Sequence, residues 1–190
     1  MRARDNPFRT ERVMTVRYRL SVSWEAFLAG LDRLGRRAAI VGPQGSGKTT
    51  LLEDLAPRLR ERGFALRELR LDDETPRFEP DFLEEFFASL GGRDFILFDG
   101  AEQLDRGAWS RFERRSRAAA GLVVTSHRPG LLPTLLETST SPELLEGLVE
   151  ELLGERVSEP LAPLHQRHQG NLREALRELY DRYALIEDGT

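Results

Sequence analysis

The sequence contains no cysteine, and this absence removes several kinds of chemistry at once. Without cysteine the chain has no disulfide, no thiolate nucleophile and no cysteine-based metal site. Its three histidines (His127, His165 and His168) are not clustered with carboxylates, so we do not expect a zinc site built only from protein ligands. The formal net charge of −4 argues against coating nucleic acid through bulk positive charge, although it allows a local basic patch.

Long apolar runs are missing too. The sequence has no stretch of about 18 apolar residues, the length that a membrane-spanning helix needs. Its first ten residues are charged and polar and lack the apolar segment of a signal peptide. We therefore expect a cytoplasmic protein with no membrane span. The 190 residues suffice for one domain with a proper core and a small appended helical piece.

Short apolar runs alternate along the chain with stretches of helical spacing. The predicted strands cover residues 37–41, 64–71, 94–98, 122–125 and, interrupted by Pro133, 131–138. The predicted helices cover residues 48–62, 80–90, 105–120, 143–153, 159–168 and 171–185. Strands separated by helices imply a parallel sheet covered on both faces. Residues 12–22 alternate weakly and predict either an extra strand or an arm.

This pattern predicts an α/β fold, a three-layer sandwich with a parallel sheet and a small helical C-terminal cap. We expect an N-terminal arm at residues 1–23, a core domain at 24–155 and the cap, or lid, at 156–190. Pro57 falls inside the first long helical stretch, where it predicts a kink or an early end.

A glycine-rich segment follows the first predicted strand and fits G-x-x-x-x-G-K-[ST] at every fixed position. Its backbone N–H groups and the positive end of the following helix suit a phosphate group. We expect Lys48 to bridge the β- and γ-phosphates of a nucleotide and the Thr49 hydroxyl to bind Mg²⁺. The predicted phosphate-binding residues are Gly42, Pro43, Gln44, Gly45, Ser46, Gly47, Lys48, Thr49 and Thr50.

A P-loop of this kind needs a carboxylate at the end of a neighbouring strand to hold Mg²⁺. Residues 95–98 are four apolar residues in a row, and Asp99 follows them. We therefore predict that Asp99 completes the Mg²⁺ site. Many P-loop ATPases place a glutamate directly after this aspartate, but here that residue is Gly100. Glu102 is the nearest candidate for the base that activates water, the alternative being a solvated carboxylate that opens a helix.

Together, the P-loop, the strand that ends Asp99-Gly100-Ala101-Glu102 and the strand that ends Val124-Thr125-Ser126-His127 resemble the additional-strand P-loop ATPases. That group includes the AAA+, STAND (NACHT-type) and ABC ATPases, and the D-G-x-acid form is most similar to the NACHT type. The resemblance covers about residues 35–155. It implies a sheet order of 5-1-4-3-2 and a polar sensor of the γ-phosphate at the tip of the strand that ends near Thr125. Among Thr125, Ser126 and His127, we favour His127.

Two further regions have counterparts in this group. The segment Gly170-Asn171-Leu172-Arg173 is similar to the AAA+ sensor-2 region, which implies that Arg173 reports the loss of the γ-phosphate. The alternative is a capped surface helix. The helix with Arg106, Arg111, Arg114, Arg115 and Arg117 could supply an arginine finger to another subunit or touch nucleic acid, or be simply solvated. The next strand follows closely after Thr125, which leaves little room for the helix that usually carries the finger.

The nucleotide base is expected to be adenine, because GTPases of the Ras type read guanine with N-K-x-D and Lys48 is the only lysine in the chain. Residues 6–8 and Tyr18 could contact it, or pack on the surface. The leading hypothesis is thus a Mg²⁺-dependent ATPase that acts as a motor or switch, alone, with a protein partner or as a homo-oligomer. The alternatives are a P-loop phosphotransferase and an ATP-dependent interaction module that does not hydrolyse ATP.

Overall fold

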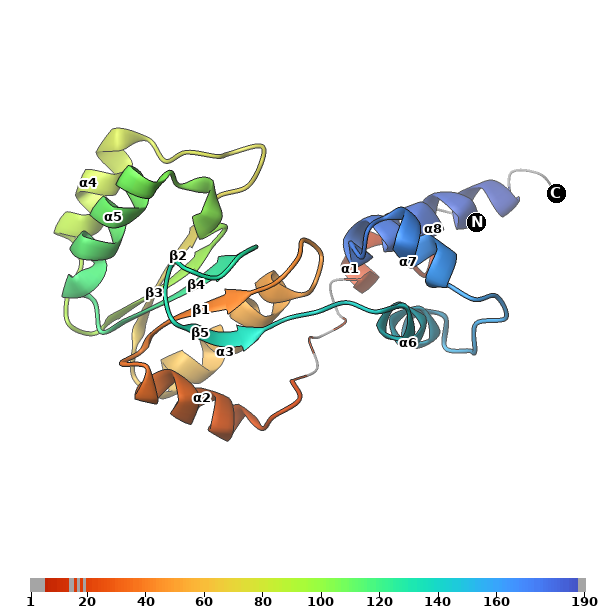
Figure 1. Cartoon of the computed structure of the whole chain (residues 1–190), viewed down its shortest axis with the longest axis horizontal. Coiled ribbons are helices and arrows are strands. Elements are labelled where there is room, and N and C mark those ends of the chain that lie inside the picture. The colour runs from red at the N-terminus through yellow and green to blue at the C-terminus, as the bar shows by residue number, and fades with distance from the viewer. Residues whose placement is uncertain (1–5, 14–15, 17, 19, 188–190) are drawn as a thin grey trace. The chain divides into compact units, whose positions relative to one another are not determined.

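The core of the fold contains a five-stranded sheet, and all of its strand pairings are parallel (Figure 1). The computed structural model of the chain describes residues 6–13, 16, 18 and 20–187. The strands are β1 (Arg37–Val41), β2 (Ala65–Arg70), β3 (Asp94–Asp99), β4 (Gly121–Ser126) and β5 (Thr134–Glu137). Their order is β2-β3-β4-β1-β5, which is the predicted 5-1-4-3-2 order seen from the other edge. The predicted α/β class and sheet order are confirmed.

Burial explains why each strand takes its place in the sheet. The central strands β1, β3 and β4 are apolar on both faces and almost entirely buried. A strand buried under helices on both sides needs such a continuous apolar run. The edge strands β2 and β5 mix apolar with polar residues and are largely exposed or half-buried. The predicted fifth strand exists, but it begins only after Pro133, whose carbonyl accepts a hydrogen bond from Ala39 N at 2.9 Å.

Helices cover both faces of this sheet (Figure 1). On one side lie α2 (Trp24–Arg33) and α3 (Lys48–Glu61), and on the other α4 (Pro80–Ala88) and α5 (Arg106–Arg115). The α3 helix continues past Pro57, so an early end there is wrong. The α5 helix ends at Arg115, earlier than predicted, and a 3-10 turn at Ser116–Ala118 follows it.

The helix α2 was not among the predicted elements. It buries Phe27, Leu28 and Leu31, and the Ser23 hydroxyl accepts a hydrogen bond from Ala26 N at its start. The serine cap before an i, i+4 apolar pair is a signal that could have located this helix.

The remaining helices form a second cluster around their own apolar core. They are α1 (Thr10–Val13), α6 (Pro142–Leu153), α7 (Ala162–Arg167) and α8 (Leu172–Glu187). Phe8 belongs to this core, and its ring meets that of Tyr183 edge-on at a centroid distance of 5.0 Å. In the described part of residues 12–22 the backbone forms no strand, so that alternative is wrong there; residues 14, 15, 17 and 19 lie outside the described residues.

Contacts divide the chain into two compact units. The sheet unit contains residues 19–42 and 48–137, and the helical unit contains residues 1–18, 43–47 and 138–190. The two ends of the predicted phosphate loop thus belong to the sheet unit, and its middle belongs to the helical unit. The functional boundaries predicted at residues 23 and 155 stay a prediction. None of the described helices is long and apolar enough to cross a lipid bilayer.

Candidate phosphate and magnesium site

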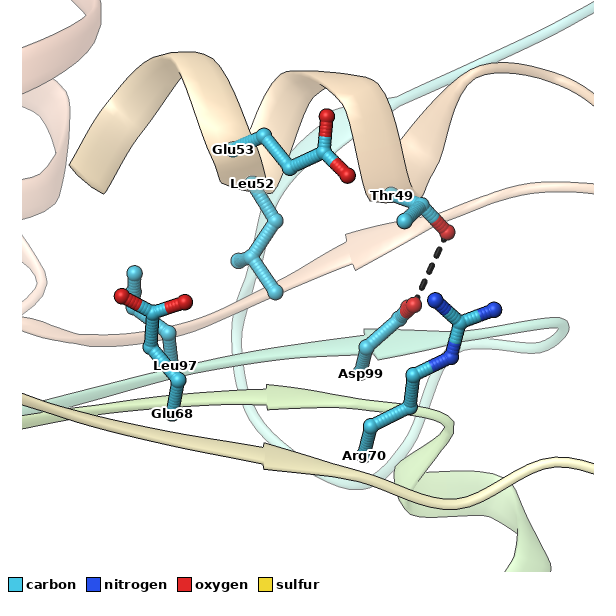
Figure 2. Close-up of a pocket in the computed structure, with 7 residues that line it drawn as sticks. All are labelled: Thr49, Leu52, Glu53, Glu68, Arg70, Leu97 and Asp99. Carbon is cyan, nitrogen blue, oxygen red and sulfur yellow. Dashed lines mark hydrogen bonds between the residues drawn. The ribbon is translucent and has the colours of Figure 1, made fainter. Parts of the chain in front are cut away.

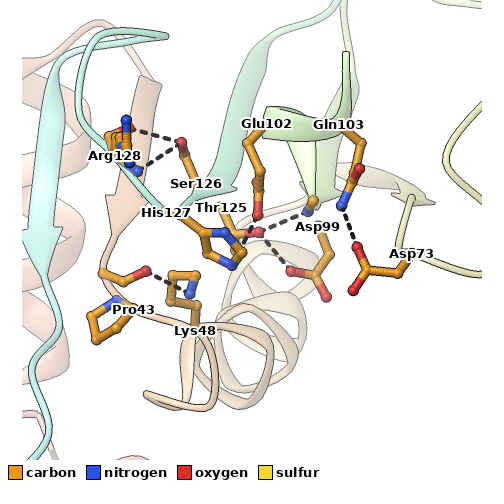
Figure 3. A network of polar contacts seen from close by, with 12 residues as sticks. Pro43, Lys48, Asp73, Asp99, Glu102, Gln103, Thr125, Ser126, His127 and Arg128 are labelled. Atoms are coloured by element: carbon orange, nitrogen blue, oxygen red, sulfur yellow. Dashed lines mark hydrogen bonds and ion pairs between the residues drawn. The ribbon is translucent and has the colours of Figure 1, made fainter. Parts of the chain in front are cut away.

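The carboxyl edge of the sheet unit brings together the polar residues that end its strands. Parallel strands end at the same edge of a sheet, and this edge is where open α/β folds bind ligands. Gly42 follows β1, Asp99 ends β3 and His127 follows β4. Lys48, Asp99, Glu102 and His127 consequently lie near one another, although they span 80 positions of the sequence (Figure 3).

Lys48 is the first residue of α3, and its side chain is directed back over the start of the loop. Its Nζ donates a hydrogen bond to Gly42 O at 2.8 Å, and the residue is only 7% exposed. Gly42 is held in turn by a hydrogen bond from its N to Ser126 O at 3.1 Å. An ammonium group is buried in this way only where partners compensate for its lost hydration. The loop therefore places the Lys48 side chain at the predicted anion site.

Thr49 and Asp99, the two predicted Mg²⁺ ligands, are in direct contact. Thr49 Oγ1 donates a hydrogen bond to Asp99 Oδ2 at 2.8 Å, between α3 and the end of β3 (Figure 2). A hydroxyl and a carboxylate are hard oxygen donors, the kind that Mg²⁺ prefers, and Mg²⁺ is usually held by one or two carboxylates together with phosphates. The donor set therefore fits the predicted ion.

A small pocket of about 110 Å³ adjoins this pair. Figure 2 shows the seven side chains that line it: Thr49, Leu52, Glu53, Glu68, Arg70, Leu97 and Asp99. The volume has room for a few water molecules and is well below the roughly 300 Å³ at which ligand pockets begin. The pocket is thus too small to hold a nucleotide base.

The last two residues of β4 and His127 directly after them contact three different parts of the site (Figure 3). The Thr125 hydroxyl donates to Asp99 Oδ1 at 2.6 Å, and Ser126 O accepts from Gly42 N. His127 Nε2 lies 3.2 Å from Glu102 Oε1. The Ser126 hydroxyl donates a hydrogen bond to Arg128 O and accepts one from Arg128 N. These two bonds hold the turn that contains His127. The strand between the two phosphate motifs therefore ties them together.

Gly100 explains why no glutamate follows Asp99. Its φ is +83°, and a Cβ at this residue would lie 2.0 Å from the carbonyl oxygen of Leu71. Neither the backbone angle nor the space admits a side chain. The chain then enters a 3-10 turn at Ala101–Gln103, and Glu102 is the first acidic residue that it presents.

Glu102 has one paired and one unpaired carboxylate oxygen. Its Oε1 faces His127, whereas its Oε2 is buried and has no hydrogen-bond partner in the part of the chain that the structure describes. The side chain of Glu102 is 21% exposed and that of His127 is 43% exposed. A buried acceptor without a donor is costly, so it favours the approach of a water molecule. The role of Glu102 as the base stays a prediction.

In the helical unit, the middle of the loop lies against the start of α8. Gly45 has a φ of +73°, and a Cβ there would lie 2.1 Å from Asn171 Oδ1. That oxygen also accepts hydrogen bonds from the backbone N of Arg173 and Glu174, at 3.1 and 3.3 Å, and so caps the helix. The Arg173 side chain is exposed, and its sensor role stays a prediction.

Other loop and N-terminal residues have defined places in the same unit. Ser46 Oγ lies 2.6 Å from Thr138 Oγ1, and a Cβ on Gly47 would lie 2.8 Å from the Tyr18 ring. Burial raises the pKa of the Tyr18 phenol. Asn6 donates to Tyr180 O at 3.0 Å and, like Phe8, is buried. Asn6 and Phe8 therefore support the helical core, and a role in adenine binding stays a prediction for residues 6–8 and Tyr18.

The arginines of α5 and the turn after it fall into two groups. Arg115 pairs with Glu84 and lies over the Phe87 ring at 4.5 Å, while Arg117 pairs with Glu113 at 3.2 Å. Arg106, Arg111 and Arg114 are exposed. Residues 127–133 contain no helix, as the short connection predicted. An arginine finger on α5 stays a prediction.

Two features of the site were not predicted from the sequence. Arg70 lines the small pocket, because β2 and β3 pair in a register that sets Arg70 beside Asp99. Leu71 contributes only a carbonyl, yet it dictates the glycine at residue 100. No motif marks either residue, because both depend on strand register.

No protein-family model and no curated protein matches the sequence. Solved structures do match, among them RuvB of Thermotoga maritima. One RuvB variant has a TM-score of 0.55 at 17% identity, over 87% of this chain and 65% of RuvB. A structure described as the RuvB Holliday junction branch migration motor has a TM-score of 0.50 at 19% identity, over 83% and 61%. The chain spans less than two thirds of RuvB, and at this identity the likeness concerns the fold alone, an α/β P-loop NTPase fold.

Proposed function

We propose that this protein binds ATP with Mg²⁺ and hydrolyses it, and that it acts as a motor or switch. One observation carries the proposal: the Thr49 hydroxyl lies 2.8 Å from the Asp99 carboxylate, 50 positions further along the chain. Thr49 closes a P-loop motif and Asp99 ends a buried strand. A hydroxyl from the loop and a carboxylate from the end of another strand of the sheet are the protein groups with which P-loop enzymes hold Mg²⁺.

In the proposed complex, the loop from Gly42 to Thr50 surrounds the phosphates with backbone N–H groups, and Lys48 supplies the positive charge. Thr49 and Asp99 would hold Mg²⁺. When bound, this ion neutralises charge on the β- and γ-phosphates. The RuvB-like fold supports this assignment as a fold-level analogy.

Hydrolysis is assigned to Glu102, whose carboxylate would accept the proton of the attacking water. His127 orients that carboxylate through Nε2 and is the proposed contact to the γ-phosphate. Arg173, in the proposed cap at residues 156–190, responds to the loss of the γ-phosphate. The motor or switch output is supported by the likeness to a structure described as a motor; a protein partner or a second copy of this chain is its proposed receiver.

The first test measures ATP binding and phosphate release without an added acceptor, for the wild type and Lys48→Ala. We expect Mg²⁺-dependent binding and phosphate release in the wild type and the loss of both in Lys48→Ala. Arg60→Ala is the matched control, because it removes an exposed cation from the same helix, and it should behave as wild type. Nucleotide binding that survives Lys48→Ala unchanged would exclude the proposed site.

The same assay separates the alternatives. A phosphotransferase would turn over only after an acceptor is added, and an interaction module would bind ATP tightly without releasing phosphate. Light scattering with and without ATP shows whether copies assemble, which an arginine finger supplied between subunits requires.

A further inference from the structure

The Thr125 hydroxyl is fully engaged at the carboxyl edge of the sheet. Thr125 is 1% exposed, and its Oγ1 makes two short hydrogen bonds, to Asp99 Oδ1 at 2.6 Å and to Gly100 N at 2.8 Å (Figure 3). The direction of both bonds follows from chemistry, because a backbone N–H can only donate. The single hydroxyl proton of Thr125 is therefore given to the Asp99 carboxylate.

Strand register brings these two side chains together. Phe98 pairs with Val124 in the parallel ladder of β3 and β4, so Asp99 and Thr125 are the next neighbours along it. Phe98 and Val124 pack in the core under α4 and α5. Alternation along a strand therefore directs the following residue of each strand, Asp99 and Thr125, to the opposite face, the side of α3 and Thr49.

The Asp99 carboxylate is thus held by one hydroxyl on each oxygen. Thr49 donates to Oδ2 from α3, and Thr125 donates to Oδ1 from β4. Thr49 is a proposed ligand of the ion, whereas Thr125 is buried behind the carboxylate and already bonded on both sides. Of the two contacts, only that of Thr125 fixes Asp99 independently of the ion.

We infer that Thr125 is a positioning residue that sets the Mg²⁺ affinity of the site by holding Asp99 and Gly100 in place. This inference rests on the proposed function. The physical reason is general: partners that hydrogen-bond to a metal-binding carboxylate orient it, and their loss costs about 10- to 100-fold in metal affinity. Removing the hydroxyl would also leave the buried Gly100 N–H without its acceptor, which loosens the turn after Asp99.

The test compares Thr125→Val, which keeps the shape and removes the hydroxyl, with Thr125→Ser, which keeps the hydroxyl. Thr134→Val makes the same chemical change at an exposed position of the edge strand β5 and is the matched control. Binding of Mn²⁺, a paramagnetic substitute for Mg²⁺, is measured by electron paramagnetic resonance with a non-hydrolysable ATP analogue present. Affinity for the same analogue is also measured in EDTA.

We expect Thr125→Val to lower Mn²⁺ affinity about 10- to 100-fold and to leave analogue affinity in EDTA unchanged. Thr125→Ser should restore most of the metal affinity, and Thr134→Val should match the wild type. Wild-type Mn²⁺ affinity in Thr125→Val would overturn the inference, and so would an equal loss of binding in EDTA, which would indicate a purely structural role. Failure of the proposed function looks different, because the wild type itself would then not bind the analogue.

Thermal unfolding establishes first that each variant is folded. If Thr125→Val does not fold, Thr125→Ala is used instead, because it removes the same hydroxyl without the branched methyl group. Its Mn²⁺ affinity and its analogue affinity in EDTA then test the inference in the same way.

Discussion

The carbonyl oxygen of Leu71 occupies the space that a side chain on Gly100 would need. A Cβ on Gly100 would lie 2.0 Å from this oxygen. The ends of β2 and β3 are also joined here by a hydrogen bond from Leu71 N to Asp99 O at 2.9 Å. Glycine at residue 100 is therefore a condition for closing β2 onto the end of β3. The absence of a glutamate after Asp99 follows from packing, and the acidic group is supplied from Glu102.

Gly100→Ala should destabilise the protein by about 3 kcal/mol or more, because a left-handed backbone angle and a steric clash act together. Gly154→Ala is the matched control. Its φ of +78° is nearly the same, but a Cβ there meets nothing within 4 Å. This control should lose only about 1 kcal/mol. Urea unfolding measures the free energy of unfolding of both variants. Equal losses of stability would show that Leu71 moves aside and relieves the clash.

Glu102→Gln should lower phosphate release about 100- to 10,000-fold and leave ATP binding intact, because the amide cannot accept the proton from water. Glu53→Gln is the comparison, since Glu53 is another acidic residue near Thr49 and lines the small pocket. We expect nearly wild-type turnover from it. Single-turnover kinetics with radiolabelled ATP measures both, and the reverse ranking of the two variants would move the base to Glu53.

His127 and Glu102 should act as one unit in hydrolysis. His127→Ala alone should slow phosphate release, because Glu102 Oε1 loses its partner at 3.2 Å. In a Glu102→Gln background, the same substitution should cost little more. A double-mutant cycle on the hydrolysis rate is expected to give a coupling of about 0.5–3 kcal/mol. Additive losses would mean that the two residues work independently.

Asp94 at the start of β3 should make stability depend on pH. Burial disfavours its charge, but hydrogen bonds from Gly91 N at 2.6 Å and Arg67 Nε at 2.9 Å outweigh burial, so its pKa lies below the ordinary value. A depressed pKa in the folded state stabilises the protein above the unfolded-state pKa of about 3.9, and this stabilisation is lost as the pH falls through the folded-state pKa.

We therefore expect Asp94→Asn to be less stable than the wild type at pH 7, with the difference shrinking below about pH 4. Urea unfolding across this pH range measures it. Asp181→Asn, at an exposed position of α8, serves as the control and should show no such trend. A difference that is constant with pH would mean that the charge of Asp94 is not what stabilises the fold.

The sequence by itself determined the elements with a local signature. The run of apolar residues at 95–98 can be recognised from the sequence alone, because a strand buried on both faces must be continuously apolar. The glycine-rich loop before Lys48 can be recognised in the same way, because a phosphate loop needs glycine at fixed positions. These two signals predicted the α/β class. With the resemblance to additional-strand ATPases, they predicted the sheet order as well.

Tertiary structure alone decided which atoms meet. Three findings depend on how β2, β3 and β4 align. Thr125 holds Asp99, Leu71 requires glycine at residue 100, and Glu102 keeps one unpaired oxygen. Shifting a strand by one residue reverses every side chain on it, and no local pattern in either partner strand records the alignment. The sequence therefore named the candidate residues, whereas the contacts among them, and the places of Arg70 and Leu71 beside them, required the fold.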